Sequence, residues 1–209
     1  MSVTAKICGL STPETLDAAI AGGASHVGFV FFPPSPRNIA FDRARSLVAR
    51  LPSHVVPVGV FVDPDEAMLS EALASGIRVA QLHKTTPERA AAIRSRVSVW
   101  TAVAVKTRAD IGQAAAYQGA ADRILYDAKT PDDAALPGGM GLRFDWKLLE
   151  NLPQPLPWAL SGGLDPANLR EAVRVTGARL VDVSSGVESA PGVKDVDKIA
   201  AFLQAVAQC

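Results

Sequence analysis

Several residues with reactive or ligand-binding groups lie where apolar, β-branched runs stop. They are a thiol, a carboxyl group and two serine–glycine turns: Cys8, Asp127, Ser161-Gly162-Gly163 and Ser184-Ser185-Gly186. A thiol and a carboxylic acid can exchange protons with a substrate, and glycine-rich turns leave backbone amides free to bind an anion. In a (β/α)8 barrel all strands end at one rim, so such residues converge on one site. The pattern therefore indicates an enzyme.

The order of the elements favours that barrel. An apolar run followed by a helix-patterned stretch recurs eight times in 209 residues. Runs such as Val58–Val62 are apolar throughout, as parallel strands buried on both faces are. The predicted fold is α/β, a single (β/α)8 (TIM) barrel forming one catalytic domain over residues 1–209. The alternative is an open doubly wound sheet, but Cys8-Gly9-Leu10-Ser11 is not a dinucleotide-binding fingerprint.

The predicted elements follow the apolar runs and the helix-start signals. The strands are expected at Val3–Cys8, His26–Phe32, Val55–Val62, Val79–His83, Val97–Val105, Arg123–Asp127, Trp158–Ser161 and Leu180–Ser184. The helices are expected from Pro13 to about Gly22, and at Phe41–Leu51, Pro64–Ala74, Pro87–Ser95, Arg108–Gln118, Trp146–Asn151, Asp165–Thr176 and Asp195–Ala207. The long segment Lys129–Gly141 is either a functional loop with a glycine hinge or a surface insertion.

Composition excludes several classes of protein. Lysine plus arginine and aspartate plus glutamate number 21 each, which argues against a nucleic-acid partner or an anionic membrane. Two cysteines at opposite ends of the chain suit neither a disulfide framework nor zinc. No His/Glu cluster supports a metal site, and no signal peptide or membrane-spanning run is visible. A cytoplasmic protein is expected, and either a monomer or a homodimer suits this composition.

The two serine–glycine turns predict a phosphate site. Ser161, Gly162 and Gly163 follow the seventh strand, and Ser184, Ser185 and Gly186 follow the eighth. Turns after strands seven and eight are where barrels of this type commonly bind phosphate. Either turn alone is also explained as an ordinary connection between a strand and a helix.

Cys8 and Asp127 are the candidate base and acid, and both face inward by strand alternation. Lys6 shares the face of Cys8, where a cation favours the thiolate, although a small buried hydrophobic cysteine is the common alternative. Leu125 shares the face of Asp127, where partial burial would raise the pKa of the carboxyl group and suit it to donate a proton. A helix cap or a salt bridge is the structural alternative for Asp127.

Two further side chains are candidates for substrate contact. Arg37 follows a proline-rich loop and can grip a carboxylate in bidentate fashion, or it is a solvated surface arginine. His83 faces inward with Gln81, and it is either a substrate contact or a core histidine. His26 and His54 are expected at the surface, at the opposite end of the barrel.

The chain resembles the phosphoribosylanthranilate isomerases of tryptophan biosynthesis along its whole length. The matching segments are Lys6-Ile7-Cys8-Gly9, Gly28–Arg37, Val58–Phe61, Gln81-Leu82-His83, Leu125-Tyr126-Asp127, Gly138–Gly141, Phe144-Asp145-Trp146, Leu160–Leu164 and Val181–Glu188. The resemblance implies an Amadori rearrangement of N-(5-phosphoribosyl)anthranilate, a phosphosugar, to the 1-deoxyribulose aminoketose. It requires no cofactor, because the substrate amine supplies the iminium electron sink.

The resemblance also implies a role for each candidate. Asp127 would be the general acid that opens the sugar ring, and Cys8 the general base that removes the C2′ proton. Arg37 would hold the anthranilate carboxylate. The phosphate would lie against the two turns: Ser161, Gly162, Gly163, Asp182, Ser184, Ser185 and Gly186. Asp182 is the awkward member of this group, because a carboxylate repels phosphate unless it orients neighbouring donors.

Two departures from the family pattern concern loops. Lys84 stands where the family usually has glycine, so the turn after His83 is expected to differ in shape. Met140–Arg143 replaces a more usual threonine and a Lys-Thr pair, which bears on closure of the loop after the sixth strand.

Two other functions compete with this one. A histidine-pathway isomerase of the same chemical type has aspartate in both catalytic positions and a duplicated half-barrel, whereas this chain has Cys8 and no evident half-repeat. A non-catalytic phosphosugar-binding barrel would keep the two turns but has no need for both Cys8 and Asp127.

Overall fold

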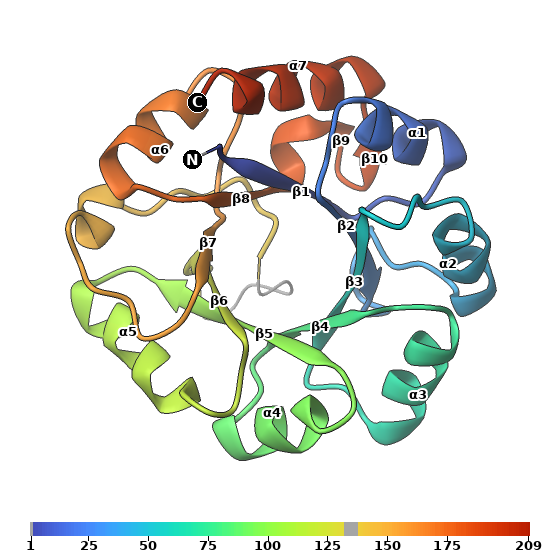
Figure 1. Cartoon of the computed structure of the whole chain (residues 1–209), viewed down its shortest axis with the longest axis horizontal. Coiled ribbons are helices and arrows are strands. Elements are labelled where there is room, and N and C mark those ends of the chain that lie inside the picture. The colour runs from blue at the N-terminus through green and yellow to red at the C-terminus, as the bar shows by residue number, and fades with distance from the viewer. Residues whose placement is uncertain (1, 132–137) are drawn as a thin grey trace.

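A computed structural model of the chain describes residues 2–131 and 138–209. Eight parallel strands close into a barrel in chain order, and helices surround it (Figure 1). The strands are β1 (Thr4–Cys8), β2 (His26–Phe31), β3 (Val56–Val62), β4 (Val79–His83), β5 (Ser98–Val105), β6 (Arg123–Ala128), β7 (Trp158–Leu160) and β8 (Leu180–Val183). The predicted barrel is confirmed, with each strand boundary within one residue of its expected place.

The helices follow the strands as expected. They are α1 (Pro13–Ala21), α2 (Phe41–Val48), α3 (Glu66–Ala74), α4 (Pro87–Arg94), α5 (Arg108–Gly112), α6 (Leu169–Thr176) and α7 (Val196–Ala207), with 3-10 turns η1 (Gln113–Tyr117), η2 (Trp146–Leu149) and η3 (Ser185–Val187). Within the described ranges, no helix combines the length and the apolar character that a membrane span requires.

Threonine–proline pairs explain where two of the helices begin. Thr12 Oγ1 accepts a hydrogen bond from the Thr15 amide at 3.3 Å, and Thr86 Oγ1 accepts one from the Arg89 amide at 3.3 Å. Each threonine thereby satisfies an amide of the first turn that has no partner inside the helix. Proline follows each threonine at the first helical position, where its fixed φ suits the helix.

Several predicted helices are shorter than expected. α2 ends at Val48 rather than Leu51, and α3 begins at Glu66 rather than Pro64. The segment Arg108–Gln118 divides into α5 and η1 at Gly112, a residue of low helix propensity. The segment Trp146–Asn151 contains only the 3-10 turn η2, which ends at Leu149. Asn151 has a φ of 52°, outside the helical range. α6 begins at Leu169 rather than Asp165, because Asp165 Oδ1 accepts the Ala167 and Asn168 amides at 2.8 and 2.9 Å and forms a side-chain turn.

A short hairpin between β8 and α7 was not predicted. β9 (Glu188–Ala190) and β10 (Val193–Lys194) pair in antiparallel fashion around Pro191-Gly192. Gly192 has a φ of 82°, a positive value that tight turns require and that glycine adopts without strain. The proline–glycine pair was therefore the available signal.

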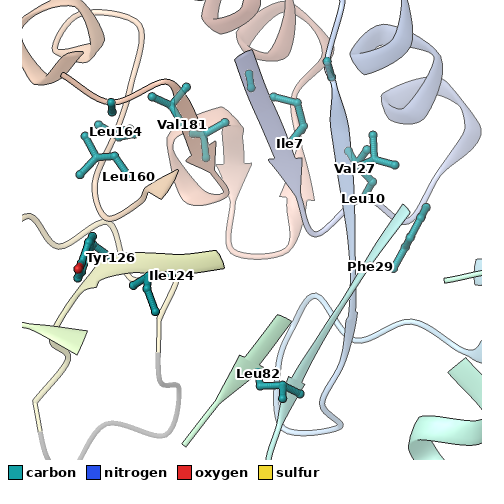
Figure 2. Close-up of a cluster of buried hydrophobic side chains, with 14 of the residues drawn as sticks. Ile7, Leu10, Val27, Phe29, Leu82, Ile124, Tyr126, Leu160, Leu164 and Val181 are labelled. Carbon is teal, nitrogen blue, oxygen red and sulfur yellow. The ribbon is translucent and has the colours of Figure 1, made fainter. Parts of the chain in front are cut away.

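Side chains alternate between the barrel interior and the surrounding helices along each strand. Figure 2 shows outward-facing members of the core between strands and helices, among them Ile7, Phe29, Tyr126 and Val181. A separate apolar layer fills the interior and consists of Val58, Val79, Trp100, Leu125, Ala159 and Leu180. Two residues after Leu125 and Leu180, the next inward positions on β6 and β8 belong to Asp127 and Asp182, and Lys6 of β1 pairs with Asp182 across the strands. The interior layer therefore lies beneath the polar residues.

We expect Leu125→Ala to lower the free energy of unfolding by about 2–5 kcal/mol, because it leaves a cavity in this interior layer, where Leu125 is 1% exposed. Urea unfolding followed by circular dichroism measures the change. Leu142→Ala is the matched control: that leucine is 39% exposed, so the same substitution should cost less than about 0.5 kcal/mol. Equal losses in the two variants would contradict this account of the interior layer.

Candidate active site

A single pocket at the carboxyl ends of the strands brings the candidate residues together. The empty volume of this pocket, counted together with the open space at its mouth, is about 830 Å³. Its lining includes every residue predicted for the site: Cys8, Arg37, His83, Asp127, Ser161, Gly162, Gly163, Asp182, Ser184, Ser185 and Gly186. The proposed acid and base, 119 positions apart in the sequence (127 − 8), therefore face the same cavity.

A buried ion pair forms the floor beneath this pocket. Lys6 Nζ lies 2.8 Å from Asp182 Oδ1, and the two side chains are 0% and 5% exposed. Ser161 Oγ donates a hydrogen bond to Asp182 Oδ2 at 3.2 Å. Burial alone would lower the pKa of Lys6, but Asp182 and Cys8 outweigh burial and raise it above its ordinary value. Lys6 is therefore a cation in the barrel interior.

Cys8 lies beside this cation but is not a low-pKa thiol. Burial, the largest effect, raises its pKa above the ordinary 9.0, and Asp182 raises it further. Lys6 and Lys194 act in the opposite direction without overcoming burial. Lys6 therefore favours the thiolate, as predicted, but burial has the larger effect on the pKa of Cys8.

Gly28 on β2 makes room for the thiol and the ammonium group. It pairs with Cys8 across the two strands. A Cβ at this position would lie 2.8 Å from Cys8 Sγ and 3.0 Å from Lys6 Nζ. A larger residue here would therefore displace both functional groups.

Asp127 carries a carboxyl group that is poised to hold a proton. Burial and the nearby Asp182 carboxylate raise its pKa from 3.8 to about 7. The Ala128 amide donates a hydrogen bond to Oδ1 at 2.9 Å and limits that rise. The predicted upward shift is therefore present. Glycines lie close on two sides: a Cβ at Gly138 would lie 2.5 Å from Oδ2, and one at Gly162 would lie 3.1 Å from Oδ1.

His83 is neutral in this environment. Burial and the Lys6 charge lower its pKa to about 4. Its Nε2 lies 3.1 Å from Gln81 Nε2, within hydrogen-bond distance of that side-chain amide. His83 also approaches Gly138, where a Cβ would lie 3.7 Å from its Cε1 atom. A neutral imidazole here is suited to hydrogen bonding rather than to charge pairing.

Arg37 is held by the protein rather than solvated. Its Nε and Nη2 donate to the two carboxylate oxygens of Glu188 at 2.7 and 2.8 Å, and Nη2 also donates to the Gly139 carbonyl at 2.9 Å. Nη1 makes no hydrogen bond within the described part of the chain. Arg37 is only 7% exposed, yet it lines the pocket, and this nitrogen is available to an anion there.

The two serine–glycine turns meet at one side of the pocket. Gly162 and Gly163 have φ of 90° and 62°, and their amides make no hydrogen bond to any residue that the structure describes. Gly186 presses against the Leu164 carbonyl, which leaves no space for a side chain. Ser184 Oγ donates to the Cys8 carbonyl at 3.3 Å. Free amides and a tight backbone are the features of an anion-binding turn.

Asp182 takes part in the ion pair on the pocket floor and accepts a hydrogen bond from a neighbouring hydroxyl group. Its two oxygens are occupied by Lys6 and Ser161 on the pocket floor. It also raises the pKa of both Cys8 and Asp127. Its visible effect is on the acid and the base, and a contact with phosphate stays a prediction.

The loop after β6 contributes Gly138–Leu142 to the pocket wall. Part of the predicted functional loop Lys129–Gly141, residues 132–137, lies outside the described residues. Met140 and Leu142, which depart from the family pattern, are 49% and 39% exposed. Lys84 adopts a φ of 53°, so the turn keeps the backbone that glycine would take there.

The remaining histidines lie away from the pocket. His54 is exposed as expected, but His26 is half-buried, with its ring centroid 5.0 Å from that of Trp100. The surface prediction for His26 is therefore wrong, because Trp100 fills the interior layer next to it. Within residues 2–131 and 138–209, no group of three His, Cys, Asp or Glu side chains is placed to hold a metal ion.

Glu188 and Lys194 were not among the predicted site residues. Glu188 binds Arg37, and Lys194 Nζ lies 2.6 Å from Glu188 Oε1. Both residues belong to the hairpin that sequence patterns did not reveal. Glu188 closes the Val-Ser-Ser-Gly-Val-Glu segment already recognised in the sequence, and that was the available signal.

Comparisons with known proteins agree with this geometry. Residues 5–205 match the family model of N-(5'phosphoribosyl)anthranilate (PRA) isomerase. The N-(5'-phosphoribosyl)anthranilate isomerase of Zymomonas mobilis subsp. mobilis is 56% identical over 210 residues, which cover 99% of each chain.

Two solved structures share the fold over the same length. Monomers generated from the dimeric phosphoribosylanthranilate isomerase of Thermotoga maritima superpose with a TM-score of 0.86 at 37% identity, covering 99% of this chain and 100% of the other. An isomerase of the same name in complex with reduced 1-(O-carboxyphenylamino)-1-deoxyribulose 5-phosphate has a TM-score of 0.86 at 36% identity and the same coverage.

We expect Asp127→Asn to stabilise the fold in a pH-dependent manner. Since the folded pKa of Asp127, about 7, exceeds its ordinary 3.8, the folded state binds more protons between these values, and wild-type stability falls as pH rises through them. The full loss is on the order of 4 kcal/mol above pH 7, because one pKa unit corresponds to about 1.4 kcal/mol. An asparagine does not ionise and avoids this loss.

Urea unfolding at pH 5 and pH 8.5 measures the effect. The advantage of Asp127→Asn should grow by about 2–3 kcal/mol between the two pH values. Asp17→Asn is the control, because the Asp17 side chain is 53% exposed in a surface ion pair, whose loss changes little. An advantage that did not change with pH would show that burial does not hold Asp127 protonated.

Proposed function

The chain belongs to the N-(5'-phosphoribosyl)anthranilate isomerase family and is such an isomerase of tryptophan biosynthesis, and we propose that it uses Asp127 as general acid and Cys8 as general base. The observation that carries these roles is that both groups open into one pocket above a shared buried ion pair. A proton donor and a proton acceptor on one substrate are what an aldose–ketose isomerisation requires.

The chemistry needs one proton donated by Asp127 and one proton accepted by Cys8, in that order. Asp127, with a pKa of about 7, donates its proton to the furanose ring oxygen, and the C1′–O bond breaks to give a Schiff base. Cys8 then removes the C2′ proton, and the electron pair moves into the iminium to form an enolamine. Tautomerisation to the ketone completes an isomerisation with no net change in atoms or electrons. The raised pKa of Asp127 favours its protonated form, which can donate a proton, whereas the raised pKa of Cys8 means that the thiol must lose its proton before it can act as a base.

The anionic ends of the substrate fit the remaining lining residues. Arg37 Nη1 is directed to the anthranilate carboxylate, and the Gly162 and Gly163 amides with Ser184, Ser185 and Gly186 hold the phosphate. His83 provides a neutral hydrogen-bonding contact beside the acid. Support comes from the related isomerase that binds a reduced carboxyphenylamino-deoxyribulose phosphate, a ligand with the same two anionic groups.

The assembly and the location are also proposals. The Thermotoga maritima relative is dimeric, with monomers generated from it, and we propose a monomer or a homodimer for this chain.

The pairing of β1 with β8, the first and the last strand of the barrel, supports one catalytic domain over residues 1–209. The absence of a membrane-spanning helix in the described ranges is compatible with a cytoplasmic location, which we propose.

The decrease in fluorescence of N-(5'-phosphoribosyl)anthranilate tests the activity with purified protein and no added metal or nucleotide. Cys8→Ala and Asp127→Asn should each lower kcat by about a hundredfold to ten-thousandfold, because each removes a proton-transfer group. Cys209→Ala and Asp17→Asn are the matched controls, since both side chains are exposed, and they should keep full activity. Wild-type turnover by either pocket variant would remove that residue from the mechanism.

The dependence of kcat/KM on pH should reflect the ionisation of both Asp127 and Cys8. Below pH 7 the rate should rise with pH, because the Cys8 thiolate becomes more abundant while Asp127 stays protonated. Above pH 7 the gain in thiolate is offset by the loss of protonated Asp127, which gives a plateau. Above the raised thiol pKa the rate should fall. The residual rate of Asp127→Asn should instead keep rising through pH 7, and a break at pH 7 in that variant would assign the break to another group.

A further inference from the structure

We propose that Glu188 and Lys194 are positioning residues that fix the Arg37 guanidinium relative to the Ser184 turn, and thereby set the spacing between the two anion-binding ends of the pocket. This inference rests on the proposed function, in which Arg37 binds a carboxylate and the Ser184 turn binds phosphate. Neither Glu188 nor Lys194 is among the described residues that line the pocket, so both would act through their neighbours.

Glu188 fixes the plane of the guanidinium. Its two oxygens accept hydrogen bonds from Arg37 Nε at 2.7 Å and from Nη2 at 2.8 Å. Such a bidentate pair defines orientation as well as distance, because both groups are planar. The two side chains are 4% and 7% exposed, so water does not compete strongly for these bonds. With Nε and Nη2 occupied, Nη1 is the nitrogen left to meet a substrate carboxylate.

Lys194 connects this pair to the turn at the other end. Its Nζ donates to Glu188 Oε1 at 2.6 Å, to the Ser184 carbonyl at 2.9 Å and to Ser184 Oγ at 3.1 Å. Ser184 Oγ in turn donates to the carbonyl of Cys8 at 3.3 Å. One buried ammonium group, 1% exposed, therefore contacts both the residue that orients Arg37 and the turn proposed for phosphate.

The backbone around this network also connects its two sides. Gly192, at the turn of the β9–β10 hairpin, lies against the Pro36 carbonyl, where a Cβ would come within 2.5 Å of the oxygen. Pro36 precedes Arg37 in the chain. Lys198 Nζ on α7 donates to the Glu188 carbonyl at 2.7 Å and holds the start of the hairpin. The hairpin thus supports the Arg37 loop through both backbone and side chains.

The charges of the network suit a positioning role. Among the described residues, Arg37 and Lys194 are two cations that share the carboxylate of Glu188, which leaves a net positive charge on this group of three. If Glu188 only neutralised charge, Glu188→Gln would make the rim more positive and strengthen binding of an anion. If it orients Arg37, the same substitution weakens binding of the carboxylate despite the added positive charge. The two roles therefore predict opposite signs.

Competitive inhibition by two ligands tests the proposal in the full-length enzyme. Reduced 1-(O-carboxyphenylamino)-1-deoxyribulose 5-phosphate has both anionic groups, whereas ribose 5-phosphate has only the phosphate. For Glu188→Gln we expect the inhibition constant of the first ligand to rise about tenfold or more, as for loss of a charged hydrogen-bonded contact, and that of ribose 5-phosphate to change less than about threefold. Lys194→Met should weaken both ligands, because Lys194 holds both ends.

A double-mutant cycle separates positioning from general support of the fold. In an Arg37→Ala background, Glu188→Gln should change the inhibition constant of the carboxylate-bearing ligand by less than about twofold, because its effect passes through Arg37. An undiminished effect in that background would overturn the proposal. So would equal weakening of both ligands by Glu188→Gln, or no weakening of either.

Loss of a buried charge can prevent folding, and Glu188→Asp addresses that case. It keeps the carboxylate on a shorter side chain, and the same preferential weakening of the carboxylate-bearing ligand is expected. Equal weakening of both ligands in this variant would again overturn the proposal. A wild-type protein that does not turn over N-(5'-phosphoribosyl)anthranilate would instead contradict the proposed function, so the two failures are distinguishable.

Discussion

The pocket depends on one buried interaction, the ion pair between Lys6 and Asp182. Removing both charges from water is costly, and the pair is favourable only because its bond is 2.8 Å long and Ser161 satisfies the second carboxylate oxygen. The pair acts on both proposed reacting groups: Lys6 lowers the pKa of Cys8 and of Asp127, whereas Asp182 raises both. Neutralising either residue alone would leave a buried charge without its partner. Loss of Asp182 would leave the Lys6 ammonium group unpaired beside the thiol, and loss of Lys6 would leave the Asp182 carboxylate unpaired beside Asp127.

The barrel brings these groups together through strand alternation. The outward neighbours pack on the helices and fix each inward position (Figure 2). A shift of a strand by one residue would turn its polar inward side chains toward the apolar layer under the helices. Packing around the barrel therefore determines where Cys8 and Asp127 point. Glycine at position 28 then keeps the space that the thiol and the ammonium group need. The same alternation of side chains along the strands therefore places the apolar core residues outward and the site residues inward.

Sequence patterns predicted the features that depend on local periodicity. The barrel, its strand ends and the inward direction of Cys8 and Asp127 follow from apolar runs and from alternation along a strand. The pairing of Arg37 with Glu188 joins residues 151 positions apart, and no local pattern encodes it. The β9–β10 hairpin was missed because its strands are too short to show a period. The balance at Cys8 was also beyond prediction, since it depends on how completely burial offsets the Lys6 charge.

Charge is distributed differently at the rim and on the floor of the pocket. At the rim, two cations share one carboxylate, Glu188, whereas on the floor Lys6 is balanced by Asp182. A substrate with an anion at each end is therefore attracted at the rim, where Arg37 and the turns lie. The proposed proton transfers take place above this ion pair, in which Lys6 lowers and Asp182 raises the pKa of both Cys8 and Asp127. The two ion pairs are nevertheless coupled, because Lys194 at the rim lowers the pKa of Cys8, so a change in the rim network would also change the pKa of the thiol.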